Sequence, residues 1–160
     1  MPSRPTPILC GDREILVSLP ERTRVIRAPD PLPPLPDPEK ALREVLAAPR
    51  GMDPLSKLVG PGARVTVAFD DPAKPLYPIR GGDFRELAIP VILEELERAG
   101  VSRDRIRLLC ANALHRQWTR GELSRILGAK LVSAFGPARL TCHDAEDLER
   151  IVFVGETARG

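Results

Sequence analysis

Both histidines of the chain lie in loops that directly follow a predicted strand. His115 follows a strand expected over residues 105–111, and His143 follows one expected over residues 139–142. In an open α/β sheet, ligands bind outside the carboxyl ends of the strands. Imidazole exchanges a proton near neutral pH, so a histidine placed there can act as a general acid or base. We therefore take His115 as the candidate catalytic residue, with capping or packing of its loop as the alternative.

The residues beside His115 favour an anionic ligand. Arg116 is the next residue, and the N-terminus of a predicted helix follows shortly after it. A cation and a helix N-terminus both favour the neutral imidazole ring, and both attract anions. Arg116 is accordingly a candidate substrate-binding residue.

A third polar loop follows the strand expected over residues 64–69. Asp71 and Lys74 lie in it, and they can pair with each other, hold a polar ligand together, or form a solvated turn. His143 and Asp144 can likewise act as a ligand pair, although Asp144 also suits an Asx-turn or a helix N-cap. We keep both interpretations of each loop.

A zinc site is conceivable from residue types alone. Two cysteines and both histidines fall at the predicted strand ends: Cys110, His115, Cys142 and His143. Their spacing matches no standard zinc pattern. We therefore assign no metal ligand in this chain.

Strands and helices alternate over the larger part of the chain. Helices are expected over residues 37–48, 84–99 and 119–127, the last opened by the capping box Thr-Arg-Gly-Glu. A further short strand is expected at residues 151–154. Strand–helix–strand alternation is typical of parallel βαβ units. The predicted fold class is α/β, with an open, mostly parallel, Rossmann-like sheet flanked by helices.

The N-terminal part is organised differently. Strand-like residues 14–19 and 24–28 are separated by a turn and predict a β-hairpin. A proline-rich run follows, and its rings impose an extended backbone. We expect a hairpin over residues 1–28, a linker over residues 29–38 and an α/β domain over residues 39–160.

Composition excludes several classes of function. A net charge of +2 and 4% aromatic residues give no basis for binding nucleic acid. No apolar run is long enough to span a bilayer, and the N-terminus lacks the apolar region of a signal peptide. The three cysteines have no CxxC spacing, which favours reduced thiols in a cytoplasmic protein.

Four motifs occur in order along the sequence. The first is Leu-Pro-Asp-Pro at residues 35–38, and the second is Asp-Pro-Ala-Lys-Pro at residues 71–75. The third is Asn-Ala-Leu-His-Arg at residues 112–116, followed by Thr119, and the fourth is His143-Asp144 with Val-Gly-Glu-Thr at residues 154–157. Together they resemble the N-terminal domain of nickel-dependent lactate racemases, a family of nickel-pincer 2-hydroxyacid racemases and epimerases. The first motif resembles the start of the family's first helix, the second and third align with its Asp-x-Thr-Arg-Pro and Thr-Gly-x-His-Arg loops, and the fourth resembles its closing stretch.

The resemblance implies a mechanism. In that family a histidine takes the hydroxyl proton of a 2-hydroxy acid while hydride moves from the α-carbon to a nickel-pincer nucleotide tethered to a lysine. By motif, His115 corresponds to one acid/base histidine, Lys74 to the arginine that engages the substrate carboxylate, and Asp71 to the neighbouring acid. Asn112 and Ala113 fall where the loop approaches the cofactor.

The chain departs from the family pattern at several of these positions. Lys74 replaces an arginine, Ala73 a threonine and Ala113 a glycine, and residues 79–83 resemble an insertion. Lysine offers a point charge where arginine binds a carboxylate in a bidentate manner. These changes favour a hydroxy acid other than lactate or a divergent family member.

The family's cofactor-bearing lysine, nickel-ligating histidine and second catalytic histidine lie beyond the matched residues. We therefore expect this chain to be inactive alone and to need a C-terminal domain as partner. The alternative is a non-catalytic α/β module that binds a small anion or nucleotide.

Overall fold

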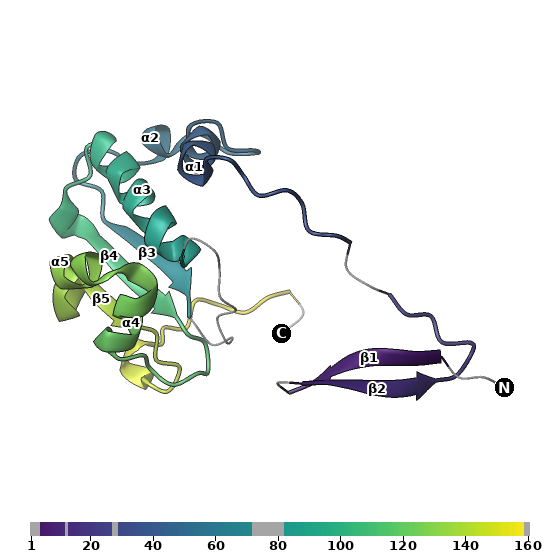
Figure 1. The fold of residues 1–160 in the computed structure, drawn as a ribbon. Helices are drawn as coiled ribbons and strands as arrows, with labels where there is room; N and C mark the ends of the chain where they lie inside the picture. The colour runs from purple at the N-terminus through teal and green to yellow at the C-terminus, as the bar shows by residue number, and fades with distance from the viewer. Residues whose placement is uncertain (1–3, 12, 27–28, 72–81, 159–160) are drawn as a thin grey trace. The chain divides into compact units, whose positions relative to one another are not determined.

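Figure 1 shows the fold in a computed structural model, which describes residues 4–11, 13–26, 29–71 and 82–158. The chain divides into two compact units, one extending to Pro34 and one beginning at Leu35. None of the helices in the described ranges combines the length and the apolar character that a bilayer span needs.

The first unit contains an antiparallel β-hairpin, as predicted, but its strands differ from the prediction. β1 (Arg4–Cys10) pairs with β2 (Arg13–Leu19), and Gly11 with φ of +67° lies in the turn. The expected second strand at residues 24–28 is wrong, since residues 24–26 are not in a strand and residues 27–28 lie outside the described part. β1 tolerates two prolines because both strands of a two-stranded sheet are edges, where a missing N–H can face solvent.

The described part of the second unit contains a parallel three-stranded sheet in the order β3-β4-β5. β3 spans Val65–Asp70, β4 spans Ile106–Ala111 and β5 spans Leu140–Cys142. The α/β fold with a parallel sheet is therefore confirmed. The three strands end at the same edge, because Asp70 is the register partner of Ala111 and Cys110 is the partner of Cys142.

Helices connect these strands. α3 (Phe84–Arg98) and the short 3₁₀ helix η1 (Arg103–Arg105) lead from β3 to β4, and α4 (Arg120–Leu127) with α5 (Ala129–Arg139) leads from β4 to β5. The capping box predicted for α4 is present. α5 was not among the helices expected from the sequence; it contains Gly136, with a non-helical φ of +59°, followed by Pro137.

Two helices precede the sheet, and an irregular segment follows it. α1 (Pro38–Ala47) begins as predicted, with the Asp37 side chain accepting from Lys40 N; α2 (Leu55–Leu58) is a single turn. After η2 (Leu148–Arg150), the strand predicted at residues 151–154 is absent, and these apolar side chains are exposed. Strand propensity describes fit to a pleated, half-buried surface, and in the described chain this segment has no pairing strand.

The core lies between one face of the sheet and helices α3, α4 and α5. Its strand residues are Phe69, Ile106, Leu108, Cys110 and Leu140. Its helix residues are Ile89, Leu93, Leu96, Leu123, Ile126, Leu127, Val132 and Phe135. The alternate strand residues Thr66, Ala68 and Arg107 are exposed. The packing fixes the strand ends, and the loops after them carry the candidate residues.

Candidate functional site

Asp71 and His115 meet at the carboxyl edge of the sheet. Their loops begin side by side, because β3 and β4 are parallel and end in register. The Nδ1 atom of His115 lies 2.7 Å from Oδ2 of Asp71. The Asp71 side chain is only 9% exposed, whereas that of His115 is 57% exposed. A sheltered carboxylate therefore supports an imidazole that is open to solvent.

Arg85 fixes the end of β3 immediately before Asp71. Its Nη1 donates to the backbone oxygen of Asp70 at 2.7 Å, while Nε and Nη2 donate to the two oxygens of Asp83 at 2.9 and 2.8 Å. Asp83 also caps α3 by accepting from Arg85 N. The Arg85 guanidinium lowers the pKa of Asp83. The start of the Asp71 loop is thus tied to the start of α3 by a charged, bidentate contact.

Asn112 builds the turn that carries His115. The backbone N–H of His115 donates to Asn112 O at 2.8 Å, and Asn112 Nδ2 donates to His115 O at 2.7 Å. The Asn112 side chain is buried, so its amide serves the turn. Ala113 within this turn has φ of +47°, a left-handed conformation that glycine adopts without strain. The glycine of the family motif at this position suits that backbone.

The contact with Asp71 selects one tautomer of His115. An ionised carboxylate can only accept hydrogen bonds, so the proton of the neutral ring lies on Nδ1. The other ring nitrogen, Nε2, then carries the lone pair that can accept a proton. This arrangement is that of a histidine base oriented by a carboxylate.

Trp118 is a site residue that the sequence reasoning missed. Its indole Nε1 donates to Oδ2 of Asp71 at 3.1 Å, the same oxygen that contacts His115. Two signals pointed to it: it is the only tryptophan of the chain and it lies three residues after His115. No sequence pattern links Trp118 to Asp71, which lies 47 positions earlier.

Arg116 is engaged with its own loop and helix. Its guanidinium binds Glu122 through both carboxylate oxygens, at 2.6 and 3.1 Å, and lies 4.6 Å from the centre of the Trp118 ring. The hydrogen bonds from Arg116, and then those from Thr119, lower the pKa of Glu122 to about 2. Arg116 therefore builds the wall of the site.

An open cavity of about 620 Å³ lies beside His115. It is lined by Ala113, Leu114, His115, Arg116, Gln117, His143, Asp144, Ala145 and Glu146. His143 N donates to Cys110 O at 2.8 Å, which places the second histidine on the same cavity. The structure thus brings both histidines, Arg116 and Ala113 together with Asp144. Lys74 lies outside the described residues.

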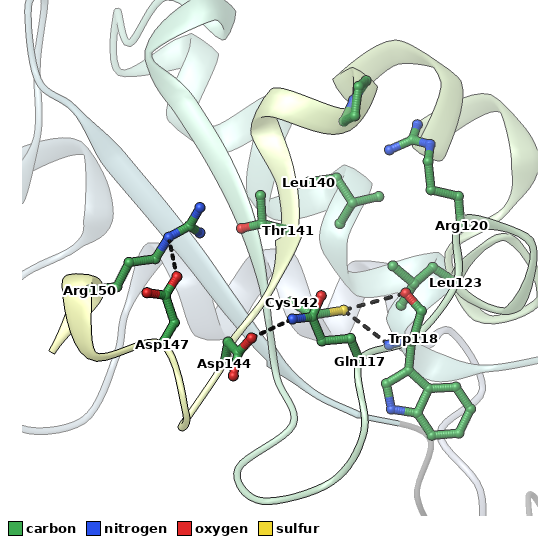
Figure 2. A pocket seen from close by; sticks show the side chains of 11 residues that line it. Gln117, Trp118, Arg120, Leu123, Leu140, Thr141, Cys142, Asp144, Asp147 and Arg150 are labelled. Atoms are coloured by element: carbon green, nitrogen blue, oxygen red, sulfur yellow. Dashed lines mark hydrogen bonds and ion pairs between the residues drawn. The ribbon is translucent and has the colours of Figure 1, made fainter.

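A smaller cavity of about 300 Å³ lies between α4 and the end of β5, as Figure 2 shows. Gln117 and Asp144 line both cavities and are joined by a hydrogen bond of 2.7 Å from Nε2 to Oδ2. Arg150 in the smaller cavity pairs with Asp147 at 3.0 Å. The hydrogen-bonded side chains of Gln117 and Asp144 therefore separate the two cavities.

The described residues include no group of three or more His, Cys, Asp or Glu side chains that could hold a metal ion. Burial, and then the neighbouring Cys142, raise the pKa of the Cys110 thiol to about 12, so this thiol is protonated near neutral pH.

The sequence was also compared with known proteins. No curated protein matches it significantly. A family model described as the lactate racemase N-terminal domain matches residues 10–160. All the loops that form the site fall within this match. Because the match extends over nearly the whole sequence, the chain belongs to the lactate racemase N-terminal domain family.

Proposed function

We propose that the chain is the N-terminal part of a 2-hydroxyacid racemase or epimerase in which His115 exchanges the proton of the substrate hydroxyl. The contact between His115 Nδ1 and Asp71 Oδ2, at the edge of an open cavity, is the observation that carries this proposal. Family membership supports the proposed reaction class, and the contact supports the proposed role of His115 as a base.

In the proposed reaction, Nε2 of His115 takes the hydroxyl proton of the 2-hydroxy acid. The α-carbon loses its hydrogen as hydride, with the electron pair of the C–H bond, and the carbon–oxygen bond becomes a carbonyl. The resulting keto acid is planar at that carbon, so return of hydride to the opposite face, with return of a proton to the carbonyl oxygen, inverts the centre. The family resemblance implies that a second histidine, outside the matched residues, is the acid/base group on the opposite face of the keto acid.

Asp71 has two roles in this proposal. It holds the proton of His115 on Nδ1, and its negative charge stabilises the imidazolium that forms when Nε2 is protonated. The low exposure of its side chain strengthens that interaction, because water screens it less.

Recognition of the substrate carboxylate falls to Lys74 in the proposal. Lys74 holds the position of the family's arginine, and Arg116, the other candidate, already binds Glu122 through two contacts. Arg116 then contributes positive charge at the cavity wall. An ammonium group attracts a carboxylate as a point charge, which imposes less geometry than a guanidinium.

The nickel-pincer nucleotide fits this site in part. A cavity of about 620 Å³ has the size of a small-molecule or cofactor site. Its described lining contains no lysine for attachment. We therefore propose that Ala113 and the Asn112 turn border the cofactor, that a C-terminal domain completes its site, and that the protein is cytoplasmic. When bound, the group supplies the acceptor for the hydride.

The test uses the full-length protein loaded with its cofactor and a panel of chiral 2-hydroxy acids. We expect loss of optical activity for at least one acid, and no turnover for His115→Ala while the cofactor stays attached. Isomerisation of none of the acids by the unaltered enzyme would refute the proposal. Near-full turnover by His115→Ala, with loss in His143→Ala, would move the role of base to His143.

The alternative of a non-catalytic binding module makes a different prediction. Calorimetry on this chain would then detect a hydroxy acid or a nicotinic acid nucleotide, while the loaded full-length protein would isomerise nothing. Silence in both experiments would exclude both functions.

A further inference from the structure

Trp118 and His115 both contact one oxygen of Asp71. The indole Nε1 lies 3.1 Å from Oδ2, and His115 Nδ1 lies 2.7 Å from the same atom. We propose that Trp118 is a positioning residue, which holds the Asp71 carboxylate so that His115 keeps its proton on Nδ1 and its lone pair on Nε2. The inference rests on the proposed role of His115 and names a residue that neither the motifs nor the family match assigns.

The chemistry of the indole fits this role. An indole N–H donates and never accepts, so it matches a carboxylate in one way only. Each carboxylate oxygen has two lone pairs, which allows Oδ2 to accept from Trp118 and from His115 together. A second donor on Oδ2 restricts rotation of the Asp71 carboxyl group. The orientation of His115 therefore depends on Trp118, which acts on the imidazole only through the shared Asp71 oxygen.

Two groups of contacts hold Trp118 itself in place. The backbone N–H of Trp118 donates to Cys142 Sγ at 3.4 Å. The Cys142 thiol in turn donates to the backbone oxygen of Trp118 at 3.6 Å, as Figure 2 shows. The Arg116 guanidinium covers the ring at 4.6 Å and is fixed by Glu122. Trp118 thus links the end of β5 and the start of α4 to the Asp71 loop after β3.

A positioning role differs from simple packing. Trp118 is half-buried and packs against the core, a task that any aromatic ring of similar size performs. Only the N–H group makes the bond to Asp71. A replacement that keeps the ring and removes this group therefore separates the two roles.

The chain offers a direct experiment because it contains one tryptophan and two histidines. Benzothienylalanine in place of Trp118 keeps the size of the bicyclic ring and replaces N–H with sulfur; Trp118→Phe is the genetic variant. Long-range ¹H–¹⁵N NMR at pH 8.5, where imidazole is normally neutral, reports the tautomer of each histidine. His143 is the internal reference, and Asp71→Asn shows the signal when the carboxylate is lost.

We expect His115 of the unaltered chain to be predominantly the Nδ1–H tautomer. Removal of the indole N–H should move the ¹⁵N signals of His115 at least halfway toward their positions in Asp71→Asn, while the signals of His143 stay unchanged. A His115 tautomer in the benzothienyl protein equal to that of the unaltered chain would overturn the proposal. Equal shifts of both histidines would also overturn it, because they would reveal a general loss of structure.

Kinetics of the loaded full-length enzyme give an independent reading. Trp118→Phe should lower kcat about tenfold, the effect of one lost hydrogen bond to a charged acceptor, with KM little changed. A raised KM at constant kcat would contradict a positioning role. If the unaltered enzyme isomerises nothing, the proposed function fails, while the NMR result still decides whether Trp118 orients His115.

Discussion

Arg116 and Glu122 form a two-point ion pair between the His115 loop and the first turn of α4, with Nη2 to Oε1 at 2.6 Å and Nη1 to Oε2 at 3.1 Å. Glu122 also completes the capping box with Thr119. The Glu122 carboxylate therefore caps the start of α4 and also binds Arg116, whose guanidinium covers the Trp118 ring. The pair connects stability of the loop to the protonation state of Glu122.

Glu122→Gln should change the pH dependence of stability. The pKa of Glu122 falls from 4.5 to about 2 in the folded protein, so its charge stabilises the fold above pH 4.5. That contribution decreases as the pH falls from 4.5 through 2, because both states then become protonated. Glutamine keeps the capping geometry but does not titrate.

Urea unfolding followed by circular dichroism at several pH values measures this effect. We expect the difference in free energy of unfolding between the unaltered chain and Glu122→Gln to be constant above pH 5 and to shrink toward pH 2. Glu21→Gln, at an exposed position, controls for the loss of one negative charge. A difference that does not vary with pH would show that the ion pair contributes nothing.

Ala113→Gly should stabilise the chain. Ala113 has φ of +47°, and a left-handed conformation costs a residue with a Cβ roughly 1–2 kcal/mol. Glycine removes this strain but adds about 0.4–1 kcal/mol of entropy to the unfolded chain, so we expect a net gain of about 0.5–1 kcal/mol by urea unfolding.

Ala111→Gly is the matched control for that substitution. Ala111 lies in β4 with ordinary strand geometry, so glycine there should cost about 0.5–1 kcal/mol. Equal losses at both positions would mean that the turn at Ala113 carries no strain.

The meeting of Asp71 and His115 was predictable because it follows from topology. Parallel strands end at one edge of a sheet, so polar loops after two such strands converge even when 44 positions separate them. The capping box at Thr119 was equally predictable, since its two hydrogen bonds form within four residues. Local sequence patterns and strand direction were therefore sufficient to predict these two central features of the site.

Other features depend on contacts that no local pattern encodes. The bond from Trp118 to Asp71 joins two loops through one indole N–H. Hydrophobic periodicity contains no information about such side-chain hydrogen bonds. The hairpin partner of β2 is β1, whose two prolines make it an atypical strand by composition. Residues 151–154 have the composition of a strand, but pairing requires a neighbour that composition does not reveal.

Lys74→Arg tests the carboxylate recognition that we propose for Lys74, in the cofactor-loaded full-length protein. A guanidinium binds a carboxylate through two parallel hydrogen bonds, and an ammonium group does not. If lactate-like acids are substrates, KM should fall about tenfold, as one added charge-assisted hydrogen bond would give. Lys57→Arg, at an exposed position of α2, is the control. An unchanged KM would remove Lys74 from the carboxylate site.

The thiols of the chain should react with iodoacetamide in a fixed order. The thiolate is the nucleophile, and burial raises the pKa of Cys110 to about 12 in a side chain with no exposed surface. Cys10 is exposed and Cys142 is half-buried between the backbone groups of Trp118. Mass spectrometry after labelling at pH 8 should therefore find Cys10 modified first and Cys110 unmodified until urea unfolds the chain. Modification of native Cys110 at the rate of Cys10 would contradict the packing of β4 against its helices, on which the position of the His115 loop depends.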